Sequence, residues 1–469
     1  MALSFSEAIS RQPLRAFSVL TFAVCMLVLI ADGMDAQLLG IVAPIVIEEF
    51  GVDRGTFGIA MGAALVGFGI GSWGGGWLGD TVGRRWSLAL ATVVFSLATI
   101  GASWSEGVQE VALDLVFWRV AAPEGVWEMA VWRLIGGLGF GSAYANAIAL
   151  AGEWLPDRWR SVGVTTLSVG TPAGGLVVAS LAPTLLEAYD WRGSFIAVGL
   201  ATLLVVLLIV FVLRDSPSFL LARGKPDEAR ITARKVLAED IELAPERHMT
   251  DTASGAIGVF DRSNLRLNIG VGIAFAAATM IAYGMLNWGT TFLTTKGFAL
   301  DEASYTVAVG GFTSIAASIA VGLLVQQLGS RIVIVTLSGS LAATLVVFML
   351  VLEGMGAAPG GGERLTVVAL YGLSAALFSA SIASFYALMT HAYPASCRSA
   401  GIGFGIFVGR VGAIAATGFG GWLIDFGEGS LVPFFGVLAV GAVLISAAAL
   451  VVDRPVPPAR TLRRVGTAA

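Results

Sequence analysis

Two carboxylates lie close together in a stretch that is otherwise apolar. The sequence "LIADGMDAQLLG" places Asp32 and Asp35 inside the apolar run Phe17–Ile47. A carboxylate at the centre of a membrane-spanning helix costs about 3 kcal/mol. Residues three apart share a helix face, so both acids can face one cavity and titrate as a coupled pair. We predict that this pair binds a proton on one side of a membrane and releases it on the other; an inert, hydrogen-bonded structural pair is the alternative.

Two arginines also lie within apolar runs. Arg133 and Arg410 fall in the fourth and the eleventh of these runs. A guanidinium group binds a carboxylate through two parallel hydrogen bonds. Arg133 can therefore pair with Asp32 or Asp35, or it can contact an anionic substrate, and the sequence leaves both roles open. Arg410 follows Gly409 in a glycine-rich segment, and we predict that it holds the carboxylate of a substrate.

Neutral polar and aromatic residues complete the predicted substrate pocket. Aromatic faces with one or two amide groups suit a flat aromatic ring that carries a carboxylate. Each of these side chains, taken alone, is more often a packing residue than a ligand. The residues are Tyr144 and Asn146 in the fourth run, Tyr283, Asn287 and Trp288 in the seventh, and Tyr386 in the tenth.

The composition is that of a protein with many membrane-spanning helices. Of its 469 residues, 56% are hydrophobic and 13% are charged, whereas a soluble domain carries about 25% charged residues. With two cysteines and two histidines, the sequence predicts no disulfide framework, no metal centre and no cofactor. It contains no Walker-type phosphate loop and no visible nucleophile–base set, so we expect neither an ATP-driven pump nor an enzyme.

Twelve apolar runs are long enough to cross a bilayer, for which a helix needs about 20 residues. They are Phe17–Ile47, Thr56–Leu78, Trp86–Ala102, Val131–Leu150, Val162–Leu186, Phe195–Leu213, Leu267–Leu293, Tyr305–Leu328, Ile332–Leu352, Leu365–Thr390, Ala400–Ile424 and Leu431–Val451. The predicted fold class is an all-α membrane protein with twelve transmembrane helices. Within the fifth run, "GTPAGG", Gly170–Gly175, is interpreted as a kinked site of close helix packing.

Positive charge marks one side of the membrane. Of the 28 lysines and arginines, 21 fall on the side of the termini, five on the other side and two inside the runs. The positive-inside rule then places both termini in the cytoplasm. We predict two six-helix bundles, 1–213 and 267–469, joined by a cytoplasmic linker over 214–266 that contains a short amphipathic helix. The polar outer insertion 105–128 is predicted to be a loop, with an interfacial helix or a partial lid as alternatives.

The two halves of the chain repeat the same motifs. "GWLGDTVGRRWSL" after the second run matches "GLLVQQLGSRIVI" after the eighth, and "EWLPDRWRSVG" after the fourth matches "HAYPASCRSAG" after the tenth. Two matched pairs at nearly the same offset imply two bundles related by an axis along the membrane normal. We therefore expect a substrate site between the bundles, near the midplane of the membrane.

Charged residues gather at the predicted cytoplasmic ends of the helices. Such a cluster can hold the two bundles together while the protein opens outward, or its arginines can simply fix the orientation in the membrane. The predicted cytoplasmic gate comprises Asp80, Arg84, Arg85, Arg160, His391 and Arg398. Glu153 is predicted to share in proton coupling. His391 can titrate near neutral pH, or it can be a solvated residue at a helix end.

These motifs resemble those of the major facilitator superfamily. "GWLGDTVGRR" resembles its cytoplasmic loop motif, and "DGMD" resembles the D-G-x-D signature of its aromatic acid:proton symporters. "RLIGGLGFG" is similar to the fourth span of those symporters, and "HAYPASCRSAGIGFGIFVGRVGAI" is similar to their tenth and eleventh spans. The resemblance covers the chain except 105–128, and it implies that the arginines matching Arg398 and Arg410 are linked to activity.

The resemblance implies a secondary transporter that imports a small aromatic carboxylate together with protons by alternating access. The expected partners are that substrate, protons and the lipid bilayer, with no nucleic acid, and the expected location is the bacterial inner membrane. A proton-coupled exporter of drugs or metabolites and a sensor that binds without transporting are the alternatives. Uptake driven by an inward proton gradient would distinguish the importer from the exporter, and ligand-induced stabilisation without flux would indicate the sensor.

Overall fold

The computed structural model describes residues 3–107, 109–115, 118–156, 159–160, 163, 166–167, 169–237, 243–244, 259–356, 359–393 and 397–457. The first half contains β1 (Leu3–Ser4), α1 (Phe5–Ser10), α2 (Ala16–Phe50), α3 (Arg54–Val82), α4 (Arg84–Ala102), β2 (Glu110–Leu115), β3 (Trp118–Pro123), α5 (Glu124–Trp154) and α7 (Gly170–Val212). The linker contains α8 (Pro217–Ala222), α9 (Pro226–Ala233), β4 (Leu243–Ala244) and η1 (Arg262–Asn264). The second half contains α10 (Leu265–Thr295), α11 (Leu300–Leu328), α12 (Ser330–Gly354), α13 (Gly361–Ala392), α14 (Arg398–Phe426) and α15 (Val432–Val451).

Helix α7 accounts for two of the twelve predicted crossings. Among the described residues, eleven helices are long and apolar enough to span a membrane. α7 is one of them and has 43 residues; a straight helix of that length would measure about 65 Å, roughly twice the hydrocarbon thickness. Asp190 interrupts it with a non-helical backbone (φ 58°, ψ 179°), so the chain reverses there and crosses back. The described helices therefore make twelve crossings, and the predicted fold class is confirmed.

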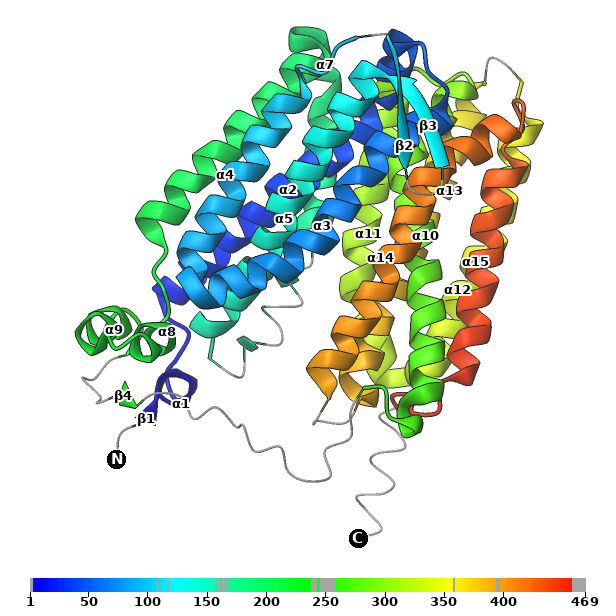
Figure 1. Ribbon diagram of the computed structural model, residues 1–469. Helices are drawn as coiled ribbons and strands as arrows, with labels where there is room; N and C mark the ends of the chain where they lie inside the picture. Colours follow the sequence, from blue (N-terminus) through cyan, green and yellow to red (C-terminus); the bar gives the residue numbers. More distant parts are fainter. Residues whose placement is uncertain are drawn as a thin grey trace, which may run out of the picture.

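The helices form two bundles that lie side by side (Figure 1). In the first bundle, α3 packs against α5, α2 packs against α7, and α4 packs against both α5 and α7. In the second, α11 packs against α13, α10 against α14, and α12 against α15. The bundles meet where α3 contacts α14, α7 contacts α11 and α2 contacts α10. Six helices, three from each bundle, therefore form the interface in which the sequence predicts a substrate site.

Glycine repeats bring helices into backbone contact inside the first bundle. A Cβ atom at Gly71 would lie 2.1 Å from the carbonyl oxygen of Leu138, and one at Gly67 would lie 2.2 Å from that of Leu134. These glycines are four residues apart, so they form one flat stripe of α3 against α5. Small residues at this spacing are the usual basis of close helix packing in a membrane, where lipid offers no hydrophobic driving force between helices.

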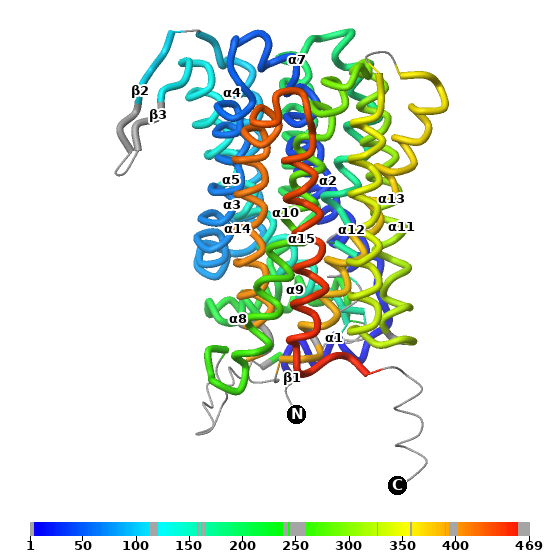
Figure 2. The backbone as a smooth tube through the Cα atoms, turned by 90° about the vertical axis from the view of Figure 1, so that its right-hand side faces the viewer, coloured from blue at the N-terminus to red at the C-terminus, as the bar shows by residue number. Residues whose placement is uncertain are grey.

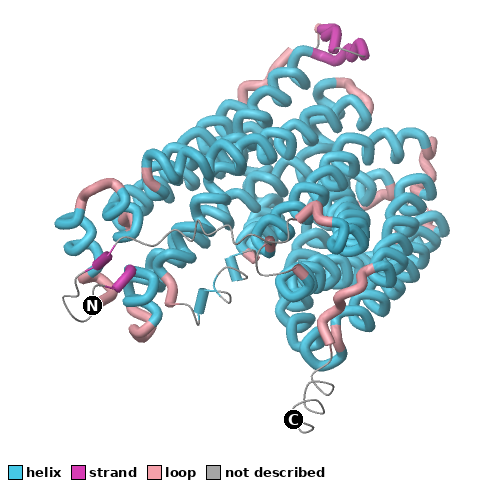
Figure 3. The backbone as a smooth tube through the Cα atoms, turned by 60° about the horizontal axis from the view of Figure 1, so that its bottom comes forward, coloured by secondary structure: helices cyan, strands magenta, loops and turns pink. Residues whose placement is uncertain are grey.

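The contact between α3 and α14 closes one end of the bundle interface and is lost towards the other. Away from the termini, a Cβ atom at Gly58 would lie 2.4 Å from the carbonyl oxygen of Gly418, and one at Gly62 would lie 3.8 Å from its Cα atom. Trp73 continues this face of α3 at helical spacing and is 85% exposed. Phe407 continues the facing side of α14 and is 70% exposed. The bundles therefore diverge towards the end that carries both termini, as Figures 1 and 3 show.

The outer insertion forms a β-hairpin, not the predicted loop or an interfacial helix. β2 pairs antiparallel with β3, with Glu110 opposite Pro123, and Figure 2 shows the hairpin projecting from the side of the helices. Trp127 Nε1 donates a hydrogen bond to the carbonyl oxygen of Val111 at 3.0 Å, which ties the hairpin to α5. In the linker, the two short helices α8 and α9 stand in place of the single amphipathic helix that the sequence predicts.

Candidate functional site

A buried ion pair inside the first bundle joins two of the predicted site residues. Arg133 of α5 donates from Nη1 to Asp35 Oδ2 at 2.7 Å and from Nη2 to the Asp35 carbonyl oxygen at 3.2 Å. Arg133 is 4% exposed and Asp35 is 7% exposed. The guanidinium also lies over the ring of Phe195, 5.7 Å from its centre. Of the two roles left open for Arg133, this geometry favours pairing with Asp35, because the charge of the arginine is already compensated.

Asp32 lies one helical turn before Asp35 but has different partners. Its carboxylate is 4% exposed and accepts a hydrogen bond from Thr171 Oγ1 of α7 at 3.2 Å. Among the described residues it forms no direct ion pair, although it lies within electrostatic range of Asp35, Arg410 and Arg133. Asp32 is therefore the less compensated of the two acids, and the charge of Arg410 couples it to the second bundle.

Arg410 of α14 reaches across the interface between the bundles. Its guanidinium carbon lies 3.7 Å from the ring centre of Phe68 of α3, and its Nη1 donates to the hydroxyl of Tyr283 of α10 at 2.8 Å. Within the described part of the chain, this half-buried arginine has no ion pair with a carboxylate. A cation that contacts both bundles and lacks a protein counter-ion is suited to bind an anionic ligand.

Aromatic side chains surround Arg410. Tyr144 and Tyr386 lie within electrostatic range of its guanidinium, as Tyr283 does. The ring of Tyr144 also packs edge-on against that of Phe68, with 5.7 Å between the centres. These residues come from α3, α5, α10 and α13, so both bundles contribute. Of the predicted pocket residues, the structure brings Tyr144, Tyr283, Tyr386 and Arg410 together.

Asn146, which the sequence predicts in the substrate pocket, forms hydrogen bonds within the first bundle. Its Nδ2 donates to the carbonyl oxygens of Gly75 and Ser142 at 2.8 Å each and lies 3.0 Å from Ser87 Oγ. The residue is 1% exposed. Its amide joins α5 to α3 and α4, because a buried amide needs partners wherever the neighbouring backbone offers them. These bonds support a role of Asn146 in helix packing, and its predicted role in substrate binding stays a prediction.

Asn287 and Trp288 also bond within one bundle rather than to the cluster. Asn287 Nδ2 donates to Thr417 Oγ1 at 2.8 Å, and Trp288 Nε1 donates to the Thr417 carbonyl oxygen at 3.1 Å. Trp288 is completely buried, between α10 and the glycines of α14. These bonds hold α10 against α14, and the predicted contacts of Asn287 and Trp288 with substrate stay predictions.

Glu153 forms part of a charge cluster at the end of the bundle that carries the termini. Arg84 pairs through Nε with Glu153 Oε1 at 2.6 Å and through Nη2 with Asp80 Oδ1 at 3.2 Å. All three residues belong to the first bundle. The structure thus groups Glu153 with the predicted gate residues Asp80 and Arg84. Glu153 is not bonded to Asp32 in the described part of the chain, and its predicted share in proton coupling stays a prediction.

Arg85 connects this end of α4 to the start of the linker. Its backbone N–H donates to Asp215 Oδ1 at 3.0 Å, and its Nη2 donates to the carbonyl oxygen of Val210. Burial raises the pKa of the Asp215 carboxyl above its ordinary value, while the amide and guanidinium groups of Arg85 oppose the rise. The contacts described for the gate residues stay within the first bundle and its linker, in keeping with the divergence of the bundles here.

The remaining gate residues are more dispersed. Arg160 Nε donates to the carbonyl oxygen of Gly152 at 2.9 Å, which ties the segment after α5 to the end of that helix. His391 is exposed at the end of α13. The side chain of Arg398 lies outside the described residues. The predicted bridging role of this group therefore stays a prediction.

An ion pair that the sequence analysis missed closes the opposite end of the bundle interface. Arg54, the first residue of α3, pairs through Nη1 with Asp425 Oδ1 at 2.6 Å, near the end of α14. The N–H of Gly55 donates to Asp425 Oδ2 at 3.2 Å. No repeated motif marks these residues, and charges at helix ends are ordinarily solvated, so the sequence carried no signal of a bond between bundles.

Two residues of the cluster were also missed. Phe68 lies in a run of apolar residues and gives no sign that a cation covers its ring. Thr171 lies in the "GTPAGG" element, which the sequence marks only as a site of close packing. A search for polar residues flanked by small residues within spans would have found Thr171.

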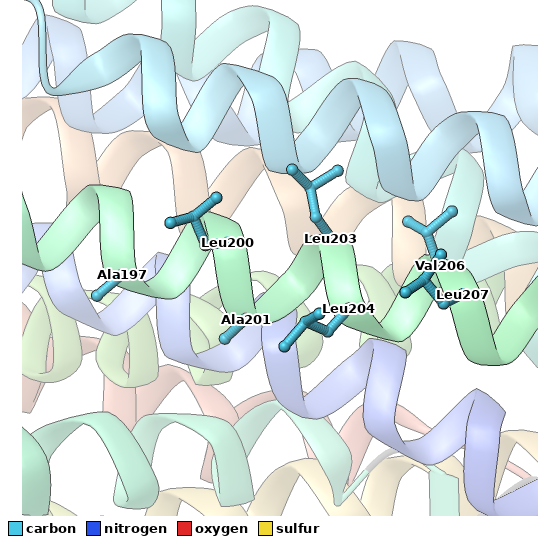
Figure 4. Close-up of a pocket in the computed structure, with 7 residues that line it drawn as sticks. All are labelled: Ala197, Leu200, Ala201, Leu203, Leu204, Val206 and Leu207. Carbon is cyan, nitrogen blue, oxygen red and sulfur yellow. The ribbon is translucent and has the colours of Figure 1, made fainter.

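A groove on α7 offers no alternative site. Figure 4 shows its lining, which consists of Ala197, Leu200, Ala201, Leu203, Leu204, Val206 and Leu207. A binding site for a small polar molecule needs a few convergent polar groups, and this lining supplies only aliphatic side chains. Leu204 is 65% exposed, as expected where a helix faces lipid.

Comparison with known families settles the class of the protein. The family model of the Major Facilitator Superfamily matches residues 25–385. The chain belongs to the major facilitator superfamily. Members of this superfamily are transporters, so the protein is a multi-pass membrane transporter and not an enzyme, as the sequence predicts.

The chain is similar to transporters of aromatic acids along most of its length. It is 25% identical to the 4-hydroxybenzoate transporter PcaK of Acinetobacter baylyi over 431 residues, which cover 90% of this chain and 87% of the relative. It is 26% identical to the gallate transporter of Pseudomonas putida over 433 residues, with 91% and 90% covered. These relatives confirm the resemblance to aromatic acid transporters.

The fold is also similar to that of a solved transporter. The inward-open structure of the xylose transporter XylE from E. coli aligns with a TM-score of 0.71 at 17% identity, covering 94% of this chain and 98% of that one. At this identity the likeness bears on the fold alone, and it supports the arrangement of twelve helices in two bundles.

Proposed function

We propose that this transporter imports a small aromatic carboxylate into the cytoplasm together with a proton. The observation that carries the proposal is Arg410, a cation placed between the bundles, without a protein counter-ion among the described residues and ringed by aromatic side chains. The carboxylate of the substrate would bind the guanidinium through two parallel hydrogen bonds. Its ring would lie against Phe68 and the tyrosines. Relatives that carry 4-hydroxybenzoate and gallate support this class of substrate.

The charges around the site account for proton coupling. In the empty carrier, ionised Asp32 and Asp35 balance Arg133 and Arg410. An anionic substrate adds one negative charge, and one proton on Asp32 restores neutrality, which lowers the cost of moving the loaded site through the membrane. Substrate and proton therefore favour each other's binding by the same factor.

The ion pair Asp35–Arg133 keeps its charges throughout this cycle. Both groups are buried and directly bonded, so protonation of Asp35 would leave Arg133 without a counter-ion in a nonpolar setting. Asp32 has a hydroxyl partner in place of a cation. The exchanged proton is therefore assigned to Asp32.

The difference between the two ends of the bundle interface supports transport by alternating access. The end with Arg54 and Asp425 is closed, and the end with the termini is open. With the termini in the cytoplasm of a bacterial cell, this conformation faces inward. In the outward-facing conformation the Arg54–Asp425 bond would break, and the cluster of Asp80, Arg84 and Arg85 would meet the second bundle.

Uptake of 4-hydroxybenzoate by proteoliposomes tests the proposal. With an alkaline interior, wild type should accumulate the acid, and one proton per monoanion makes this accumulation insensitive to a membrane potential. Asp32→Asn should lose accumulation but keep exchange of internal for external substrate, because its empty site carries one net positive charge and becomes neutral, and able to reorient, only when the anionic substrate is bound. The exposed Asp301→Asn serves as the matched control and should behave as wild type.

Two results would contradict the proposal. Extrusion of substrate in response to the same gradient would indicate an exporter. Ligand-induced stabilisation with neither accumulation nor exchange would indicate a sensor.

A further inference from the structure

Helices α2 and α7 touch through their backbones beside Asp32. A Cβ atom at Gly33 would lie 1.9 Å from the carbonyl oxygen of Thr171, and one at Gly174 would lie 1.9 Å from that of Ile30. No side chain larger than hydrogen fits at either glycine without separating the helices. The crossing therefore fixes the distance between Thr171 and the residue that precedes Gly33, which is Asp32.

The hydroxyl of Thr171 makes the direct hydrogen bond to the Asp32 carboxylate in the described part of the chain, with 3.2 Å between Oγ1 and Oδ2. The other charged or titratable groups that face Asp32 are Asp35 on its own helix, Arg133 and Tyr144 on α5, and Arg410 on α14. They act at longer range. Thr171 thus holds the orientation of the acid, while the other groups contribute electrostatic potential.

A hydroxyl suits both states of a carboxyl group that exchanges a proton. It donates to the ionised carboxylate, and after a rotation it accepts a hydrogen bond from the protonated acid. An ammonium or guanidinium group in the same place could only donate, and it would oppose protonation. The chain therefore pairs a cation with Asp35 and a hydroxyl with Asp32.

We propose that Thr171 is a positioning residue for proton exchange, whose hydroxyl orients the Asp32 carboxylate and sets the pH at which the transporter takes up its proton. This inference rests on the proposed function and deepens it. The hydroxyl favours the ionised form by donating to it, so its removal favours the protonated form at any given pH.

The test compares Thr171→Val, which has nearly the same shape, with Thr171→Ser, which keeps the hydroxyl. Proton-driven uptake of 4-hydroxybenzoate into proteoliposomes is measured as a function of external pH. The pH at half-maximal uptake should rise by about one unit in Thr171→Val and stay near the wild-type value in Thr171→Ser. Thr366→Val is the matched control, because the hydroxyl of Thr366 only donates to Gly362 of its own helix.

An unshifted pH profile in folded Thr171→Val, or an equal shift in Thr171→Ser, would overturn the inference. If Thr171→Val does not fold, Thr171→Ala removes the same hydroxyl without adding a methyl group, and the same criteria apply. Failure of the proposed function would look different, because wild type itself would then show no proton-driven uptake.

Discussion

Arg133 of α5 and Arg410 of α14 lie well inside membrane-spanning helices, and their surroundings differ. Arg133 is buried inside one bundle and bonds to the side chain and the backbone of Asp35. Arg410 lies between the bundles, over the ring of Phe68 and bonded to the hydroxyl of Tyr283. The first arginine has its counter-ion in the chain, and the second has none among the described residues. If Arg410 binds the substrate as proposed, the position of a charge relative to the interface between the bundles, rather than its depth in the membrane, separates a structural from a ligand-binding role.

The largest expected effect is on stability, and it follows loss of the internal pair. Asp35→Asn leaves the Arg133 guanidinium buried without a counter-ion, so the free energy of unfolding should fall by about 3–5 kcal/mol. Arg410→Met should lower it by less than about 1 kcal/mol, because no carboxylate is directly bonded to Arg410 and Asp32 acts on it only at longer range. Denaturant or thermal unfolding in detergent measures both. If both variants lost the same free energy of unfolding, the proposed difference between Arg133 and Arg410 would be wrong.

A smaller effect is expected at the ring beneath Arg410. Phe68→Leu removes the aromatic face on which the guanidinium lies, and the affinity for 4-hydroxybenzoate should fall about 3- to 30-fold. Isothermal titration calorimetry measures the change. Phe348→Leu, a core substitution in the second bundle, should lower stability and leave affinity unchanged. If both variants lose affinity to the same extent, general loosening of the fold explains the result better than contact with Arg410.

The smallest effect is expected at Asp215, which meets Arg85 outside the membrane. Burial raises the pKa of the Asp215 carboxyl, so the folded protein holds this proton more tightly than the unfolded chain. Lowering the pH from neutral towards the ordinary Asp pKa of about 4 therefore favours the folded state, and over this range wild type should gain Tm relative to Asp215→Asn. A Tm difference that stays constant across this range would show that the carboxyl does not titrate differently in the two states.

The sequence predicted the fold well because a bilayer imposes a simple rule. Runs of about 20 apolar residues become helices wherever backbone groups must bond internally, and the twelve crossings follow. Two of the expected runs lie in the single helix α7, which reverses direction at Asp190, so the number of crossings is unchanged. The outer hairpin was not foreseen, because its alternation is short and a polar insertion outside the membrane is under no comparable constraint.

The site was only partly predictable. Asp32, Asp35, Arg133 and Arg410 stand out because charges in apolar runs are costly. Asn146 and Trp288 are bonded within their own bundles, which the sequence could not foretell, because it does not show which face of a helix meets its own bundle. Asn146 reaches α3 and α4 because glycines of α3 let that helix pack closely against α5. These helices are far apart in the sequence, so the sequence alone does not reveal the contact.

The most direct test of the central claim is binding of 4-hydroxybenzoate and its neutral amide, 4-hydroxybenzamide, to purified wild type and Arg410→Met, measured by calorimetry. If Arg410 holds the carboxylate, the variant should lose about 10- to 100-fold in affinity for the acid and little for the amide. An equal loss for both ligands, or unchanged affinity for the acid, would contradict the account.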